Sequence, residues 1–150
     1  MKDTVSKNLL FYKIDTNTYL PLPYAEEGIK AGFPSPAQDY MGEVIDLNKE
    51  LIKNPATTFY AKVVGDSMKD EDIKNGDILI VDKSLELKNE DLAVCYIDGE
   101  FTLKRVLLES DRVWLVPSNP DYPKIEVTVK NEFIIWGIVT FTIKNNRRRR

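Results

Sequence analysis

From Thr57 onward, the apolar residues of the chain come in short runs that are rich in β-branched and aromatic side chains and are bounded by Asn, Gly, Asp and Pro. This pattern favours β-strands over helices. Asp98-Gly99 is a two-residue turn signal that predicts a hairpin between two neighbouring runs. Many short strands at regular spacing predict a mainly β body of the barrel or sandwich type. The predicted strands are Phe59–Val64, Ile78–Val81, Leu92–Ile97, Phe101–Leu108, Val113–Val116, Ile125–Val129 and Phe133–Ile143.

The first part of the chain has a different character, because prolines and glycines interrupt every possible long helix and the apolar residues show no sustained period. This predicts an extended N-terminal arm, in which Leu9–Ile14 is a short strand that docks on the body. A first helix is expected to begin at Ser35, followed by a proline at the first helical position, and to end early at Gly42. A second helical face includes Leu47 and Leu51 and stops before Pro55, since the residue preceding proline is pushed out of helical geometry.

The length, composition and charge of the chain limit the functions that it could have. A chain of 150 residues can bury a single core. No stretch approaches the roughly 20 apolar residues of a membrane span, and the N-terminus lacks a signal-peptide core, so the cytoplasm is the expected location and no membrane partner is expected. The net charge of −3 and the pI near 5.1 argue against a domain that mainly grips phosphates. Arg147–Arg150 is interpreted as a solvated tail rather than a nucleic-acid contact, and Cys95 as a buried structural thiol.

The chain has no histidine, which excludes a Ser-His-Asp triad, a Cys-His pair and any histidine-ligated metal site. Gly65-Asp66-Ser67-Met68 ends one apolar run, and Lys104 lies inside a later one. A serine hydroxyl needs a base, and lysine can serve only when burial makes its amine neutral. Taken alone, the Ser67 segment is typical of a turn that ends a strand, and Lys104 of a surface lysine. Asp77 and Asp82 flank a strand and are interpreted as turn and cap residues.

Four blocks in fixed order carry a resemblance that changes this weighting. The blocks are Ala31-Gly-Phe-Pro-Ser-Pro-Ala-Gln-Asp-Tyr40, Phe59-Tyr-Ala-Lys-Val-Val-Gly-Asp-Ser-Met68, Asn75-Gly-Asp-Ile-Leu-Ile-Val-Asp82 and Asp98-Gly-Glu-Phe-Thr-Leu-Lys104. The last three resemble the catalytic blocks of the LexA-type self-cleaving serine peptidases, and the first resembles the cleavage region of the UmuD branch of that family. The match runs from about residue 31 to about residue 143.

The resemblance implies a β body of the LexA and signal-peptidase type and a catalytic Ser-Lys pair. Ser67 is then the nucleophile, with its backbone amide donating to the oxyanion, and Lys104 is the base. The scissile bond is Ala31–Gly32, between small residues in an extended segment. The implied division is a cleavable arm of residues 1–31, a peptidase body of residues 32–144 and a basic tail of residues 145–150. Neither a cofactor nor a metal is expected.

By the same resemblance, a RecA filament on single-stranded DNA promotes cleavage, and the shortened protein assists a UmuC-type Y-family DNA polymerase in SOS mutagenesis. A homodimer is expected, because the family dimerises and exposed strand edges invite pairing. The alternative is the catalytic domain of a LexA or phage-type repressor. It is disfavoured because about 30 residues before Gly32 show no helix pair for sequence-specific DNA binding. Signal peptidase is disfavoured by the lack of a predicted membrane anchor, and a catalytically idle binding module by the presence of both Ser67 and Lys104.

Overall fold

The computed structural model describes residues 2–5, 9–16, 21–24, 43–65, 72–117, 121 and 123–147, and for residues 2–5, 21–24 and 43–44 it describes the backbone alone. The chain forms two compact units. One contains Met1–Ile14 together with Ala56–Arg150, and the other contains Asp15–Pro55. The helix predicted to begin at Ser35 lies outside the described residues.

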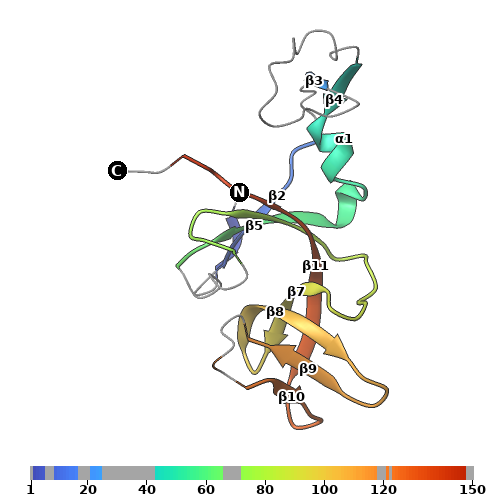
Figure 1. Cartoon of the computed structure of the whole chain (residues 1–150), viewed down its shortest axis with the longest axis vertical. Coiled ribbons are helices and arrows are strands. Elements are labelled where there is room, and N and C mark those ends of the chain that lie inside the picture. The colour runs from blue at the N-terminus through green and yellow to red at the C-terminus, as the bar shows by residue number, and fades with distance from the viewer. Residues whose placement is uncertain are drawn as a thin grey trace. The chain divides into compact units, whose positions relative to one another are not determined.

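Within the described residues, the larger unit is built on one nine-stranded antiparallel sheet (Figure 1). Its spatial order is β1-β2-β5-β6-β11-β7-β8-β9-β10. The mainly β body predicted from the sequence is thereby confirmed. In chain order the strands are β1 (Lys2–Val5), β2 (Leu9–Lys13), β5 (Thr58–Val63), β6 (Ile78–Asp82), β7 (Leu92–Ile97), β8 (Glu100–Leu108), β9 (Val113–Val116), β10 (Ile125–Val127) and β11 (Phe133–Ile143).

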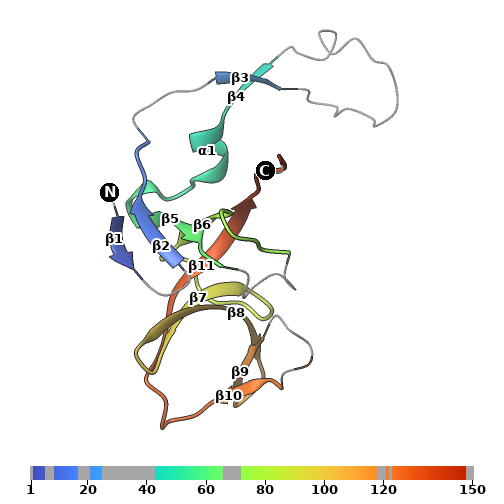
Figure 2. The same cartoon turned by 90° about the vertical axis from the view of Figure 1, so that its left-hand side faces the viewer.

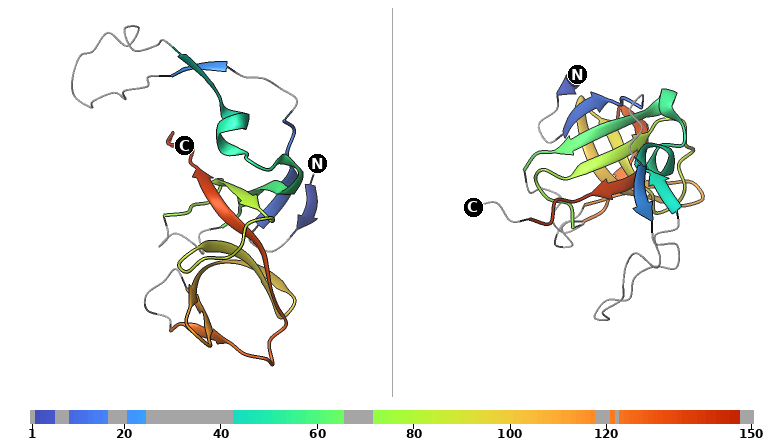
Figure 3. Two further views of the ribbon diagram at one scale, coloured as in Figure 1. Left: turned by 90° about the vertical axis from the view of Figure 1, so that its right-hand side faces the viewer. Right: turned by 90° about the horizontal axis from the view of Figure 1, so that it is seen from above.

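The long strand β11 joins the two halves of this sheet. Its residues Phe133–Ile138 pair with β7, and Ile138–Ile143 pair with β6. Figures 2 and 3 show β11 in red, leading from the region of β6 into the curved strands β7 to β10. The register shifts on both sides of Gly137, which marks an irregularity where the strand changes partners. A Cβ atom at this position would lie 2.5 Å from Val81 Cγ1, so only glycine fits without movement of a neighbour.

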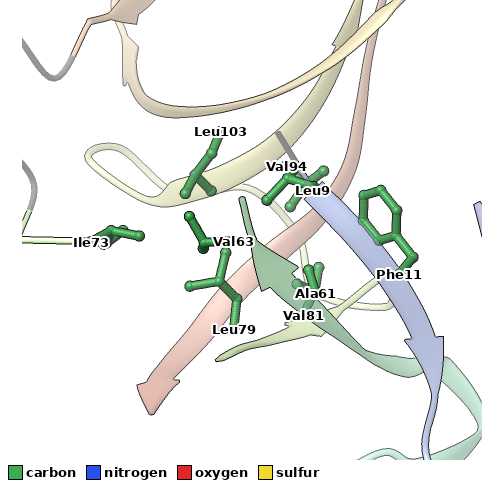
Figure 4. Packing of buried hydrophobic residues seen from close by; sticks show 9 residues of the cluster. All are labelled: Leu9, Phe11, Ala61, Val63, Ile73, Leu79, Val81, Val94 and Leu103. Carbon is green, nitrogen blue, oxygen red and sulfur yellow. The ribbon is translucent and has the colours of Figure 1, made fainter. Parts of the chain in front are cut away.

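Side chains on both faces of the sheet are buried, in two clusters. The alternation of β7 separates them, because Val94 belongs to the first cluster while Ala93 and Cys95 belong to the second. Cys95 is fully buried, as the sequence predicted. The first cluster (Figure 4) is made of Leu9, Phe11, Ala61, Val63, Ile73, Leu79, Val81, Val94 and Leu103, and the second of Ala93, Cys95, Val106, Leu115 and Ile138.

The predicted strands match the observed ones to within two residues at each end where both are described. The hairpin at Asp98-Gly99 is confirmed, since Ile97 pairs with Glu100 across the turn. Both turn residues have positive φ, 47° and 89°, as a two-residue turn of this type requires. The docking of an N-terminal strand on the body is also confirmed, because β2 pairs with β5 along its whole length.

The smaller unit contains a strand pair and a short helix. Strand β3 (Pro21–Tyr24) pairs with β4 (Glu43–Asp46), and helix α1 (Leu47–Leu51) follows directly. The Asp46 carboxylate accepts a hydrogen bond from the Asn48 amide at 3.1 Å and so caps the helix. The helix ends before Pro55, as predicted, and a 3₁₀ turn, η2 (Pro55–Thr57), leads into β5. None of the helices in the described residues is long and apolar enough to cross a membrane.

Candidate active site

Lys104 lies in the middle of β8, directly across from Ala93 of β7. Residues opposite each other in an antiparallel pair project from the same face of the sheet, and residues two apart on a strand share that face. Lys104 therefore projects on the side of Cys95 and Val106, which both belong to the second buried cluster. Its side chain is half-buried. The apolar setting that the sequence suggested for this lysine is present.

This setting changes the proton affinity of the amine. Burial lowers the pKa of Lys104 from its ordinary value of 10.5, because the charged ammonium loses hydration. A negative charge on the Cys95 thiol would oppose that effect, but burial also raises the pKa of Cys95 to about 12. Near neutral pH the thiol is therefore protonated and does not hold the ammonium in its charged form. Less free energy is therefore needed to deprotonate Lys104 than to deprotonate a solvated lysine.

The segment that should carry the nucleophile is closed at its base by backbone hydrogen bonds. The Gly76 amide donates to the Val63 carbonyl at 2.8 Å, and the Val63 amide donates to the Asp77 carbonyl at 2.9 Å. The Gly65 amide donates to the Asn75 side-chain oxygen at 2.9 Å. Gly65 and Gly76 adopt φ values of +85° and +91°, which glycine reaches without strain. The described residues on the two sides of this segment, 63–65 and 75–77, are therefore held together by hydrogen bonds.

Asp77 reinforces this base. Its side chain is 7% exposed, and the carboxylate accepts a hydrogen bond from the Lys74 amide at 2.9 Å and forms an ion pair with Lys144 Nζ at 2.5 Å. Lys144 also donates to the Asp72 carbonyl. Asp82 accepts hydrogen bonds from Thr57 and Ser84 at the other end of β6. The turn and cap roles predicted for the two aspartates are confirmed.

Sequence reasoning missed Lys144 and Asn75 as supports of this loop. Lys144 is 67 positions from Asp77, and it meets the carboxylate only because β11 pairs with β6. No local sequence pattern signals such a contact. Asn75 belongs to one of the four matching blocks, but its support of the loop was not predicted, although a polar residue next to a glycine is a common turn signal.

Packing also connects the loop base to strand β8. Val63 precedes the loop and Ile73 lies near its end, and both pack in the first cluster together with Leu103 (Figure 4). Leu103 is the residue before Lys104 on β8. Leu103 and Lys104 project from opposite faces of the sheet, so this packing ties Val63 and Ile73 to β8 on the face opposite the Lys104 side chain.

An open cavity of about 800 Å³ also adjoins the loop base. Its described lining comes from three places in the chain: β2, the segment around the loop, and the residues that follow β11. Lys104 is absent from that lining, so this cavity is distinct from the surroundings of the lysine. Among the lining residues are Leu10, Tyr12, Lys62, Asn75, Asp77 and Lys144.

Ser67 and the bond between Ala31 and Gly32 lie outside the described residues, so the structure places only Lys104 among the predicted site residues. Within the described ranges, no group of three or more His, Cys, Asp or Glu residues could hold a metal ion.

Comparison with known proteins identifies the family. Residues 23–140 match the family described as Peptidase S24-like, which covers more than three quarters of the chain. The chain belongs to the peptidase S24 family. It is a UmuD-like member, as the four sequence blocks indicated, and so falls among the self-cleaving peptidases of the SOS mutagenesis type.

Individual relatives agree with this assignment. The S24 chain is 42% identical to protein SamA of Salmonella typhimurium over 125 residues, which cover 83% of this chain and 86% of SamA. It is 40% identical to protein MucA of Escherichia coli over 123 residues, 81% of this chain and 84% of MucA. It is 34% identical to LexA repressor 2 of Xanthomonas axonopodis over 119 residues, 79% of this chain but 55% of that repressor.

Proposed function

We propose that the chain cuts itself between Ala31 and Gly32 with a Ser67–Lys104 pair. The neutral amine of Lys104 removes the proton from Ser67 Oγ, which attacks the carbonyl carbon of Ala31. The amide of Ser67 donates to the resulting oxyanion. When the tetrahedral intermediate collapses, the C–N bond breaks and Gly32 leaves as an amine that takes the proton from Lys104. Water then hydrolyses the ester on Ser67, giving residues 1–31 and residues 32–150.

The observation that carries this proposal is the state of Lys104. In a chain without histidine, a lysine half-buried against an apolar cluster, with a pKa below its ordinary value, has the property that a general base needs. A solvated lysine stays protonated near neutral pH and cannot accept the proton. Membership in a family of self-cleaving serine peptidases supports the same role.

The proposed biological role follows the resemblance to the UmuD branch. A RecA filament on single-stranded DNA promotes the cut in the cytoplasm. The processed protein, as a homodimer, becomes the accessory subunit of a UmuC-type Y-family polymerase that copies damaged DNA. Similarity to SamA and MucA over most of their length supports this context. Sedimentation of the processed protein should give a dimer at micromolar concentration, and pull-down should recover the polymerase.

Intact-mass analysis tests the chemistry. The protein is incubated with RecA, single-stranded DNA and nucleotide, and separately at alkaline pH without RecA. Masses of residues 1–31 and 32–150 are expected. Ser67→Ala and Lys104→Arg should both abolish them, since guanidinium stays charged at any accessible pH. Matched controls are Ser110→Ala and Lys130→Arg, which change exposed residues of the same types. Cleavage at another bond, or full activity of Lys104→Arg, would contradict the proposal.

A second candidate, the catalytic domain of a repressor, is favoured by the similarity to LexA repressor 2. The two roles differ in DNA binding. A repressor retards operator DNA before cleavage and loses it afterwards, whereas an accessory subunit changes polymerase output and binds no specific sequence. Gel-shift selection on random duplex DNA, with cut and uncut protein, distinguishes them.

A further inference from the structure

Strand β2 is an interior strand of the nine-stranded sheet. It pairs with β5 from Leu9 opposite Val63 to Lys13 opposite Phe59, and β1 covers its other edge. An interior strand has its backbone groups paired on both sides, whereas an edge strand leaves one row open. The N-terminal segment is thus built into the sheet.

The side chains of β2 belong to the core as well. Leu9 is 2% exposed and Phe11 is 1% exposed, and both are members of the first cluster. The Phe11 ring lies 4.7 Å from the Trp136 ring and 5.3 Å from the Phe101 ring, measured between centroids. These are distances at which aromatic pairs attract each other. Without β2, the first cluster would lose two of its largest apolar side chains.

The proposed cut lies elsewhere in the chain. Ala31–Gly32 falls in the unit of residues 15–55, whereas β1 and β2 belong to the unit that contains the rest of the sheet. Cutting this bond breaks none of the hydrogen bonds between β2 and β5 and none of the contacts of Phe11. It removes only the covalent connection between the two pieces, which in the uncut chain raises the effective concentration of the strand at its binding surface.

We propose that strands β1 and β2 stay bound in the sheet after the chain is cut, so that the processed protein is a non-covalent complex of two pieces. This inference rests on the proposed function for its cleavage site. The binding surface is the edge of β5 with the apolar positions beneath it, and its occupant is the chain's own N-terminal segment. Recognition is by strand addition: backbone pairing with β5 supplies affinity, and the sites filled by Leu9 and Phe11 supply specificity.

Retention of β2 would also determine the surface next to the loop base at residues 63–65 and 75–77. Leu10 and Tyr12 point away from the first cluster and line the open cavity together with Asn75 and Lys144. A partner of the processed protein therefore meets a cavity whose wall includes the cut segment. Loss of the segment would expose Val63 and the β5 edge instead.

The test makes the cut independently of self-cleavage. A Ser67→Ala chain receives a recognition sequence for a site-specific endoprotease between Ala31 and Gly32, and is nicked with that protease. Size-exclusion chromatography at micromolar concentration precedes denaturing mass analysis of each fraction. Both pieces are expected in the same fraction, in equal amounts, with tryptophan emission unchanged. Elution of the short piece alone, or precipitation of the long piece while the short piece stays in solution, would overturn the inference.

Two variants of the nicked chain make the result specific. Phe11→Asp places a charge in the first cluster and should release the short piece. Lys13→Asp, at the exposed end of the same strand, should leave it bound. Hydrogen exchange of the unsubstituted nicked chain supplies a measurement that needs no core variant. Amides of β2 should exchange as slowly as in the uncut chain, and exchange at the rate of an unfolded peptide would contradict retention.

Failure of the proposed function gives a different result. If the wild-type chain never cuts itself at Ala31–Gly32, intact-mass analysis reports that directly, while the nicked Ser67→Ala chain still reports whether β2 holds. If self-cleavage proceeds and the pieces separate, the proposed function stands and the retention does not.

Discussion

Replacing Leu9 by alanine should destabilise the sheet strongly, although Leu9 lies only nine residues from the N-terminus. Its side chain is 2% exposed and packs in the first cluster with Val63 and Val94. Truncating a buried leucine to alanine removes its transfer free energy and leaves a cavity, and together these cost about 2–5 kcal/mol. A domain of ordinary stability has about 5–15 kcal/mol in total. Leu9→Ala should therefore remove a large part of it.

Urea unfolding followed by tryptophan emission measures this loss. Both tryptophans, Trp114 and Trp136, belong to the unit that contains the sheet, so the signal reports on that unit. All variants carry Ser67→Ala, which keeps the chain whole under the proposed function. With a denaturant slope of about 2 kcal/mol per molar urea, the midpoint should fall by roughly 1–2.5 M.

The matched control is Leu85→Ala, which truncates a leucine that is 42% exposed. Its free energy of unfolding should stay within about 0.5 kcal/mol of the parent chain. The reasoning is refuted if Leu9→Ala and Leu85→Ala unfold at the same urea concentration, because β2 would then contribute nothing to the sheet.

Three further predictions concern the site and its supports. Because burial lowers the pKa of Lys104, the rate of cleavage without RecA should rise with pH through that lowered pKa and level off below pH 10.5, the ordinary lysine value, as followed by quenched-flow mass analysis. A rate that does not change between about pH 7 and 10 would contradict the base role. Gly137→Ala should cost about 1–3 kcal/mol by chemical unfolding, since its Cβ would lie 2.5 Å from a stiff Val81 methyl group; an unchanged midpoint would mean that β11 shifts freely. Asp77→Ala should lower the free energy of unfolding by about 1–3 kcal/mol, because it leaves the Lys74 amide and the Lys144 ammonium without their carboxylate. The control Asp111→Ala, at an exposed position, should lower it by less than about 0.5 kcal/mol.

Local chemistry explains what the sequence predicted correctly. The hairpin between β7 and β8 follows from Asp98-Gly99, whose positive φ angles are the ones that such a turn requires. The end of α1 before Pro55 follows from the restriction that proline places on the residue preceding it. Each of these features is decided by a few neighbouring residues, so a pattern a few residues long is sufficient to predict it.

Partners that are distant in the chain could not be predicted in the same way. The sequence predicted β11 as one long strand, but not that β6 and β7 would share it or that the register would shift near Gly137. Strand β3, Pro21–Tyr24, was not predicted because proline is depleted in strands. Its pairing with β4 is a contact that the propensity of neither segment specifies.

The same distinction between local and distant features applies to the candidate site. Lys104 was singled out by the resemblance of the Asp98–Lys104 block to a family block, whereas its residue type and position alone are typical of a surface lysine. Its lowered pKa could not be derived from spacing, since the burial comes from the strand pairing that places it beside Ala93 and Cys95. The support of the loop base by Lys144 depends in turn on the pairing of β11 with β6.

The placement of β2 alters what a cut in the arm can do to the protein. A cut between Ala31 and Gly32 changes chain connectivity within residues 15–55, and under the proposed retention the sheet keeps the contacts that β2 makes with β5 in the uncut chain. A protein that lost β2 would expose a sheet edge and part of its core, and such edges pair readily with other chains. Under the proposed retention, processing frees the ends at Ala31 and Gly32 without that hazard. The change that distinguishes the cut from the uncut protein is then confined to the unit of residues 15–55. Substitutions in that unit should therefore change the activity of the processed protein more than substitutions on the sheet surface do.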